Sequence, residues 1–312
     1  MIATSSIPLS AAELSAAIRE ERAYDAARLD RVLSIDEDRG LVEVQACTPW
    51  KAIAAALRPG DARAARTQTV MPTVADSVSC NTAGPDGRPA VTHVESIVLI
   101  TPRGELVRAS RSANRELFAL VAGGQGLFGA LYSITLQIAS LARAVSLAAD
   151  KPLSSSIGAS RPLELLLPPE NLDAFLAEAR ERCAQWRMPL ADVDVRRTTQ
   201  ENDSFLCWAR REYAHVALRI AEPDALGVAV RALQLRRELI AAAIARGGSF
   251  PIHSTPEATR EQVEGCYPQL AGFLAEKRRI DPAERWTNAW YRHYRSLFSR
   301  RSCAVRWSAA AD

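Results

Sequence analysis

Residues 123–129 read Gly-Gly-Gln-Gly-Leu-Phe-Gly, and Gly124, Gly126 and Gly129 among them spell G-x-G-x-x-G. In a nicotinamide-dinucleotide (Rossmann) site this string follows a strand and opens a helix, so that a pyrophosphate lies at the helix N-terminus. Here the order is reversed. Residues 114–122 have helix formers at helical spacing, and residues 131–138 alternate like a strand. The order helix, glycine turn, strand argues against a nicotinamide-dependent enzyme.

The composition excludes other classes of protein. The chain has 312 residues, enough for a sizeable core and two domains, and its 39 Lys and Arg nearly balance its 36 Asp and Glu. No basic block with interleaved aromatic residues stands out, so we expect no nucleic-acid partner. The arginine-rich stretch 292–306 is expected to be a solvated helix.

The six cysteines form no C-x-x-C pair, and the four histidines show no ligand spacing. We therefore expect no metal site and reduced thiols. The sequence has no signal-peptide pattern and no apolar run long enough to span a bilayer. These observations together predict a cytoplasmic protein.

The hydrophobic periodicity predicts an α+β fold in two parts. In the first 140 residues, a helix capped by Ser10 and Glu13 precedes the segment 28–35, which leads through a turn into a strand at 41–45. Further strands are expected at 92–101, 105–109 and 131–138, with helices at 50–57 and 114–122. Lysine, proline, serine and glycine gather at 150–162, which indicates a linker. Beyond it we expect strands at 163–167, 191–198, 215–220 and 249–253, and helices at 169–186 and 224–245. This pattern suits an antiparallel sheet with helices on one face.

Four blocks of sequence carry a resemblance to a known family. They are residues 30–57, 73–84 (TVADSVSCNTAG), 123–136 (GGQGLFGALYSITL) and 267–286 (YPQLAGFLAEKRRIDPAERW). In order and spacing they resemble the vanillyl-alcohol-oxidase-type (PCMH-type) FAD-linked oxidases. Within that family the chain is most similar to bacterial relatives of the aldonolactone, alditol and decaprenylphosphoryl-ribose oxidases. The resemblance covers roughly residues 25–140 and 250–295.

The resemblance implies a two-domain flavoprotein. Residues 1–145 would form a PCMH-type FAD-binding domain, residues 146–255 a substrate-binding cap domain, and residues 256–312 helices that return to the FAD domain. The implied activity is hydride transfer from an alcohol, lactone or sugar-like hydroxyl to N5 of a noncovalently bound flavin, with a small sugar- or polyol-like substrate. The alternative is a degenerate, non-catalytic relative that serves as a binding or accessory subunit and binds FAD weakly or not at all.

The resemblance also assigns cofactor-binding residues to two segments. In residues 73–84, backbone N–H groups would approach the FAD pyrophosphate, and the matching positions are Thr73, Val74, Ser77, Asn81 and Gly84. The glycine turn and the strand after it would lie along the flavin and adenine, with Gly126, Gly129, Leu131 and Ile134 as the matching positions.

Two features depart from the family's pattern. The family usually has Gly-Gly where this chain has Ala75-Asp76, and a carboxylate about 5 Å from a phosphate costs on the order of 3 kcal/mol at an effective dielectric near 20. The glycine-rich loop of the family's first βαβ unit has no counterpart in residues 1–24, and the cap is short. We therefore expect an incomplete first subdomain, from either a shortened family member or a start upstream of Met1. Both departures favour the alternative function.

In such oxidases a base or hydrogen-bond donor handles the hydroxyl proton of the substrate. His253, at the end of the expected strand 249–253, lies where relatives place a polar active-site residue and is a catalytic candidate; a structural histidine is the alternative. Lys277, in the matched C-terminal helix, is the second candidate, with a solvated lysine as the alternative. Arg210, Arg211 and Arg219 could meet an anionic substrate but more simply form a charged solvent face.

Overall fold

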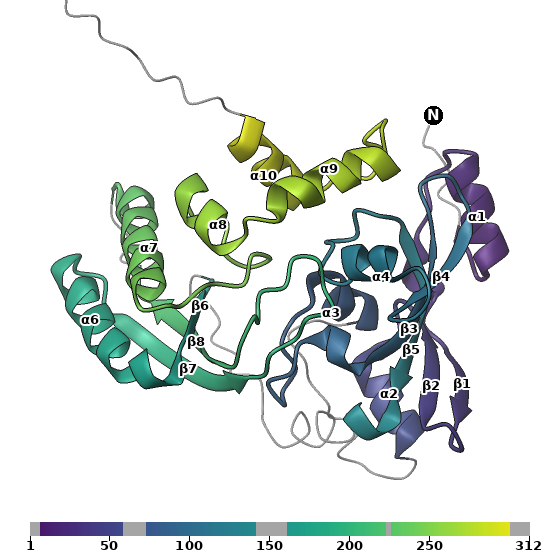
Figure 1. The fold of residues 1–312 in the computed structure, drawn as a ribbon, viewed down its shortest axis with the longest axis horizontal. Coiled ribbons are helices and arrows are strands. Elements are labelled where there is room, and N and C mark those ends of the chain that lie inside the picture. The colour runs from purple at the N-terminus through teal and green to yellow at the C-terminus, as the bar shows by residue number, and fades with distance from the viewer. Residues whose placement is uncertain (1–6, 59–72, 142–160, 223–225, 300–312) are drawn as a thin grey trace, which may run out of the picture.

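The computed structural model describes residues 7–58, 73–141, 161–222 and 226–299, and two antiparallel sheets organise them (Figure 1). The first sheet has the strand order β1-β2-β5-β3-β4, and the second has the order β6-β8-β7. The strands of the first sheet are β1 (Val32–Asp36), β2 (Leu41–Gln45), β3 (Val94–Ile100), β4 (Leu106–Ser110) and β5 (Ala130–Gln137). Those of the second are β6 (Leu163–Leu167), β7 (Leu190–Thr198) and β8 (Tyr213–Ile220).

Helices lie beside both sheets (Figure 1). Those of the first part are α1 (Ala11–Arg19), α2 (Trp50–Leu57), α3 (Val74–Cys80) and α4 (Arg115–Val121). Those of the second part are α6 (Leu172–Gln185) and α7 (Val228–Ala245), followed by α8 (Arg260–Cys266), α9 (Leu270–Ile280) and α10 (Ala289–Ser299). In the described part of the chain, no helix is long and apolar enough to cross a membrane.

The second sheet has one apolar and one polar face. Leu165 of β6 lies opposite Val216 of β8, and Leu163 lies opposite Leu218, so these buried side chains share a face. Helices α6 and α7 lie along one side of this sheet (Figure 1), and Phe175 of α6 and Leu239 of α7 are fully buried. The predicted arrangement, an antiparallel sheet with helices on one face, is confirmed.

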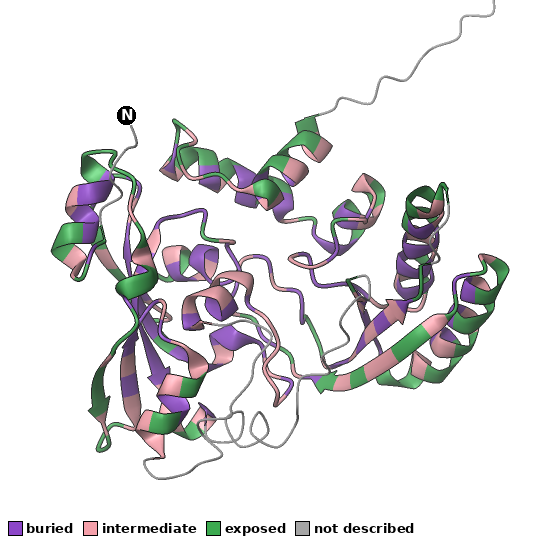
Figure 2. Ribbon diagram, turned by 180° about the vertical axis from the view of Figure 1, so that it is seen from behind, coloured by how far each residue is buried: buried purple, intermediate pink, exposed green. Residues whose placement is uncertain are grey.

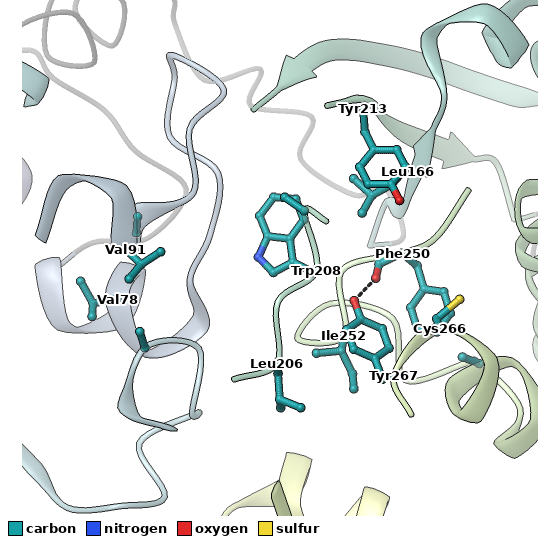
Figure 3. Packing of buried hydrophobic residues seen from close by; sticks show 14 of the residues in the cluster. Val78, Val91, Leu166, Leu206, Trp208, Tyr213, Phe250, Ile252, Cys266 and Tyr267 are labelled. Atoms are coloured by element: carbon teal, nitrogen blue, oxygen red, sulfur yellow. Dashed lines mark hydrogen bonds between the residues drawn. The ribbon is translucent and has the colours of Figure 1, made fainter. Parts of the chain in front are cut away.

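One hydrophobic cluster spans the two sheets. Trp208, on the connection between β7 and β8, lies between Val78 and Val91 of the first part and Leu166 and Phe250 of the second (Figure 3). Figure 2 shows buried residues on the strands and on the inward sides of the helices. Because the shared cluster is buried, the two parts pack as one core rather than as independent lobes.

Most predicted elements are confirmed, and β2, α2 and β6 have the predicted bounds. The strand predicted at 249–253 is wrong. Only Ser249 pairs with the sheet, in an isolated bridge to Leu166, and Ser254 N then bonds to Pro251 O in a turn. Proline has no N–H to donate to a ladder, so Pro251 ends the pairing. The segment 28–35, which leads into β2, contains most of β1, and β1 begins at Val32 after a short 3₁₀ helix (Ala26–Arg28).

Two of the predicted segments lie partly outside the described residues, and one predicted helix is divided in two. The linker at 150–162 and the end of the arginine-rich stretch lie largely outside the described residues. Helix α10 (Ala289–Ser299) covers the described part of that stretch, as the sequence predicts. The helix predicted at 169–186 is a 3₁₀ turn (Pro169–Asn171) followed by α6.

Candidate functional site

The glycine turn joins α4 to β5, in the predicted order. A Cβ on Gly124 would lie 2.0 Å from Leu120 O, and one on Gly129 would lie 2.4 Å from Ile100 O. These two positions therefore need glycine for the packing of the protein itself. Gly126 differs, because its backbone has φ +69° and a Cβ there would meet no atom within 4 Å. Gly126 is the glycine of the string that faces open space.

Gly126 lines a cavity of about 450 Å³. The cavity lies between residues 18–24 at the end of α1, the glycine turn, and residues 285–288 between α9 and α10. Its volume falls within the range of small-molecule sites. The walls carry two guanidinium groups, Arg22 and Arg285, and two aromatic rings, Tyr24 and Trp286, whose centroids are 6.4 Å apart. Arg22 pairs with Glu20 at 2.7 Å, and Arg285 pairs at 3.2 Å with Glu21, which also lines the cavity. The two rings suit an aromatic ligand, and a negative charge on that ligand would compete with these carboxylates for the guanidinium groups.

Direct hydrogen bonds hold the walls of the cavity together. Arg285 Nη2 donates to Ile18 O at 3.1 Å, and Arg285 Nη1 lies 3.2 Å from Glu21 Oε1. Asn288 Nδ2 donates to Gln125 O in the glycine turn at 2.8 Å. Burial raises the pKa of Tyr24 to about 12, so its hydroxyl stays protonated at neutral pH. The cavity is therefore built by three segments that are distant in sequence.

Lys277 lies behind this wall and is fully buried, so the interpretation as a solvated lysine is wrong. Its ammonium pairs with Asp281 and lies 5.8 Å from the ring centroid of Tyr291. Asp281 also accepts hydrogen bonds from the backbone N–H groups of Arg285 (3.1 Å) and Trp286 (2.9 Å). Burial alone would raise the pKa of Asp281, but Lys277 and these N–H groups hold it below its usual range. The ion pair thus fixes the loop that presents Arg285 and Trp286 to the cavity.

Residues 73–84, expected to hold a pyrophosphate, contain helix α3, and its first four N–H groups all bond within the protein. They are Val74 N to Thr48 O (3.2 Å), Ala75 N to Ala46 O (2.9 Å), Asp76 N to Thr73 Oγ1 (3.2 Å) and Ser77 N to Thr73 O (3.2 Å). Thr73 Oγ1 also donates to the Asp76 carboxylate at 2.6 Å. A pyrophosphate needs free N–H donors and no adjacent carboxylate. This segment does not fit one.

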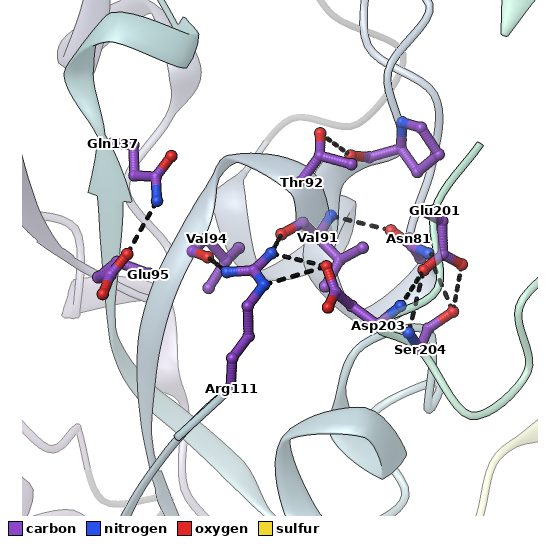
Figure 4. A network of polar contacts seen from close by, with 11 residues as sticks. Asn81, Val91, Thr92, Val94, Glu95, Arg111, Gln137, Glu201, Asp203 and Ser204 are labelled. Carbon is purple, nitrogen blue, oxygen red and sulfur yellow. Dashed lines mark hydrogen bonds and ion pairs between the residues drawn. The ribbon is translucent and has the colours of Figure 1, made fainter. Parts of the chain in front are cut away.

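Asn81 follows α3 in the left-handed conformation, is fully buried, and links the two parts of the molecule (Figure 4). Asn81 Nδ2 donates to Glu201 Oε1 (3.2 Å) and Ser204 Oγ (3.3 Å), and Asn81 Oδ1 accepts from Val91 N (2.9 Å). The carbonyl of Asn81 accepts from Trp208 Nε1 at 2.8 Å. The side-chain N–H groups of Asn81 are therefore bonded to residues of the connection between β7 and β8.

The other predicted cofactor residues lie in the core or in turns. Val74 and Ile134 are fully buried, and Leu131 is nearly so. Ser77 Oγ accepts from Trp50 Nε1 at 2.9 Å, and Gly84 N donates to Arg88 O at 2.8 Å. Of the nine residues predicted to bind the cofactor, Gly126 alone lines the cavity.

His253 lies in a second polar site, beside the second sheet. The residue as a whole is partly exposed, but its Nδ1 is buried and has no hydrogen-bond partner among the described residues. Burial lowers the pKa of His253 to about 4. The neighbouring residues are Glu164 of β6, His215 of β8 and Ser254, whose hydroxyl donates to Glu164 Oε2 at 2.5 Å. No sequence motif includes Glu164 or His215, although each is a polar residue inside an apolar strand pattern.

Comparisons with known proteins agree with this fold. Residues 10–110 match the model of a family described as an FAD binding domain. The search of curated proteins found no match. Three solved structures are similar along most of their length. Wild-type BBE-like 1 of Physcomitrella patens has a TM-score of 0.62 at 10% identity, covering 90% of this chain and 89% of that one.

A chitooligosaccharide oxidase has a TM-score of 0.63 at 11% identity, with 90% of both chains covered. A xylooligosaccharide oxidase from Myceliophthora thermophila C1, in complex with xylobiose, has a TM-score of 0.56 at 14% identity, covering 85% of this chain and 80% of that one. At these identities the likeness shows the fold alone. The chain therefore has the mixed fold of helices and antiparallel sheets that these oxidases have, as predicted.

The two segments expected to hold FAD thus differ in how well their residues fit the cofactor. The cavity at Gly126 offers aromatic rings and an open glycine backbone, which fit an aromatic group, and its two guanidinium groups pair with Glu20 and Glu21. The segment at α3 offers no free donor among its first four N–H groups and has Asp76 in its first turn. The residues fit part of FAD at the cavity and do not fit its pyrophosphate at α3.

Proposed function

We propose that this chain is an FAD-dependent oxidoreductase that oxidises the CH–OH group of an alcohol, a lactone or a sugar-like substrate. The observation that supports the proposal is the open cavity at Gly126, within the fold of FAD-linked oxidases. FAD, when bound noncovalently, supplies the acceptor for the hydride. The cytoplasmic location stays a prediction.

The residues around the cavity have distinct tasks in this proposal. Tyr24 and Trp286 would pack against the rings of the cofactor. Arg22 and Arg285 would turn from Glu20 and Glu21 toward negative charge on the cofactor. Lys277 would act indirectly, because its pair with Asp281 orders the loop that carries Arg285 and Trp286. Lys277 is thus proposed as a positioning residue.

His253 is the proposed acceptor for the proton of the substrate hydroxyl. Burial keeps its imidazole neutral at pH 7, which is the protonation state that a general base needs. The proposed substrate is sugar-like, because two of the similar structures are named oxidases of chitooligosaccharides and xylooligosaccharides.

A second candidate function has its own support. A non-catalytic relative that binds no FAD would serve as a binding or accessory subunit. The internal hydrogen bonds of α3, the carboxylate of Asp76 and the engaged amide of Asn81 favour this candidate. All three occupy positions that the family resemblance assigns to the cofactor.

The spectrum of the purified full-length protein distinguishes the two candidates. The oxidoreductase is expected to show flavin absorbance, either as purified or after incubation with FAD and removal of the excess. Under anaerobic conditions, a panel of sugars and polyols is then expected to bleach that absorbance, and His253→Gln is expected to slow the bleaching at least tenfold. A protein that stays colourless with excess FAD is the second candidate.

A further inference from the structure

The charged side chains on the walls of the cavity at Gly126 are matched in sign. Arg285 Nη1 lies 3.2 Å from Glu21 Oε1, and Arg22 Nε lies 2.7 Å from Glu20 Oε2. Glu21, Arg22 and Arg285 line the cavity, and Glu20 lies just beside it in the chain. Because two carboxylates face two guanidinium groups, these four side chains together carry no net charge.

The turn that ends α1 places Glu21 in the wall of the cavity. Glu21 N bonds to Ile18 O at 3.2 Å and Arg22 N bonds to Ala17 O at 2.9 Å, which is the Schellman pattern of a helix end. This pattern holds Glu21 in the left-handed conformation, with φ +54°. At the end of α7 the same pattern has Gly247 (φ +73°), which takes this conformation without steric cost. The carboxylate of Glu21 thus reaches the cavity from a position where glycine is the easier residue.

Arg285 is held from two sides. Its Nη2 donates to Ile18 O at 3.1 Å, and its Nη1 faces the carboxylate of Glu21. The side chain of Arg285 is 35% exposed and that of Glu21 is 69% exposed, so a ligand in the cavity can reach the pair. An exposed ion pair is weak, and an anionic ligand can therefore take Glu21's place, but only by breaking the pair. A ligand without negative charge leaves the pair intact.

No other cation at the cavity is left to offset Glu21. Among the described lining residues, the second cation is Arg22, which is already paired with Glu20. The ammonium of Lys277 lies behind the wall, where it is fully buried in its pair with Asp281. A negative charge that enters the cavity therefore has to compete with a carboxylate for each guanidinium group.

We propose that Glu21 is a specificity-determining residue of the cavity at Gly126, which holds Arg285 in an ion pair and so favours an uncharged aromatic ring over the same ring carrying a phosphate. Guanidinium groups bind phosphates strongly when they are free to do so. Removing the carboxylate of Glu21 therefore strengthens the binding of the phosphorylated ligand, and it does so through Arg285. As a statement about flavins, the inference rests on the proposed oxidoreductase function.

The test compares riboflavin with FMN, which have the same ring system and differ by one phosphate. Their binding to the full-length protein is measured by flavin fluorescence. We expect the wild type to bind riboflavin more tightly than FMN. Glu21→Gln is expected to tighten the binding of FMN at least threefold and to change that of riboflavin by less than 1.5-fold. In an Arg285→Gln background the same substitution is expected to tighten FMN binding by less than twofold, because no guanidinium is released.

Two controls separate the charge of Glu21 from its backbone conformation. Arg187→Gly relieves the same left-handed conformation (φ +55°) at the end of α6, where Met188 N bonds to Cys183 O in the same pattern. Glu37→Gln removes an exposed carboxylate from the turn between β1 and β2. Both are expected to leave the two affinities unchanged, whereas Glu21→Gly is expected to tighten FMN binding as Glu21→Gln does.

Three results would overturn the inference. They are a gain in FMN affinity below twofold in Glu21→Gln, an equal gain for riboflavin and FMN, and no binding of either flavin by the wild type and Glu21→Gln. The outcome is separable from that of the proposed function. A protein that shows the expected flavin affinities but stays colourless with excess FAD keeps the inference and loses the oxidoreductase function. A flavoprotein bleached by its substrate, in which Glu21→Gln changes both affinities equally, keeps that function and loses the inference.

Discussion

Thr73 and Asp76 bond to each other twice at the start of α3: Thr73 Oγ1 donates to Asp76 Oδ2 at 2.6 Å, and Asp76 N donates to Thr73 Oγ1 at 3.2 Å. The hydroxyl is an N-cap, and the carboxylate lies in the first turn, where the helix dipole favours a negative charge. The protein thus supplies its own anion at the point where the family resemblance implies a phosphate.

The first prediction concerns this carboxylate. If the FAD pyrophosphate lay beside α3, Asp76→Asn would remove about 3 kcal/mol of repulsion and raise FAD affinity on the order of a hundredfold. Because the N–H groups of α3 are already bonded, we expect a change of less than twofold. Fluorescence titration with FAD measures it, and Asp173→Asn, in the first turn of α6, is the matched control. A large gain in affinity confined to Asp76→Asn would place the pyrophosphate at α3 after all.

The second prediction concerns the buried ion pair. Lys277→Met leaves the carboxylate of Asp281 buried without its ammonium, so the free energy of unfolding is expected to fall by about 3 kcal/mol. Lys51→Met, at an exposed position of α2, is expected to change it by less than about 0.5 kcal/mol. Urea denaturation measures both values. A loss below about 1 kcal/mol in Lys277→Met would show that the pair does not hold the loop.

The third prediction concerns Asn81. Asn81→Gly removes the amide that joins Glu201, Ser204 and Val91 but tolerates the left-handed backbone (φ +49°), and it is expected to destabilise the protein by about 2 kcal/mol. Asn81→Ala adds the strain of a Cβ in that conformation and is expected to cost about 1 kcal/mol more. Hydrogen exchange should show lost protection at the Val91 amide in both variants. Full protection of that amide in Asn81→Gly would contradict the assigned contact.

The fourth prediction concerns pH. Burial lowers the pKa of His253 to about 4, whereas an unfolded imidazole has a pKa near 6.5. Between these values the unfolded chain binds a proton that the folded protein excludes. Stability is therefore expected to fall as the pH drops from about 6.5 to about 4, with up to about 3 kcal/mol due to His253.

Urea unfolding at pH 7 and pH 4.5 measures this dependence. His253→Gln is expected to lose most of the difference between the two pH values. His293→Gln removes another histidine whose pKa is lowered by burial, and it should keep the part due to His253. If the free energy of unfolding differed between the two pH values by the same amount in His253→Gln and in the wild type, His253 would not be the source of the pH dependence.

The sequence predicts the local elements well because their signals are local. Alternation defines β5, and the N-cap Ser10 defines α1. The strand at 249–253 fails because one proline outweighs its apolar pattern. Gly124 and Gly129 look like ligand glycines but are required by the carbonyls of Leu120 and Ile100, which only the fold brings near.

The site residues could be predicted only in part because tertiary contacts assemble them. The cavity joins residues 18–24, 126–127 and 285–288, and no spacing in the sequence reveals that meeting. Glu164 and His215 meet through the register of β6 and β8. Sequence patterns identify chemistry within one element, whereas these sites depend on pairing between elements.

The most direct test of the proposed function is equilibrium binding of FAD to the wild type and to Arg285→Gln. Arg285 joins α1 to the wall of the cavity at Gly126 and presents one of its two guanidinium groups. The proposal predicts that the wild type binds FAD, that Arg285→Gln weakens binding at least tenfold, and that Arg180→Gln, at an exposed position of α6, leaves it unchanged. No binding by the wild type, or equal binding by all three proteins, would contradict it.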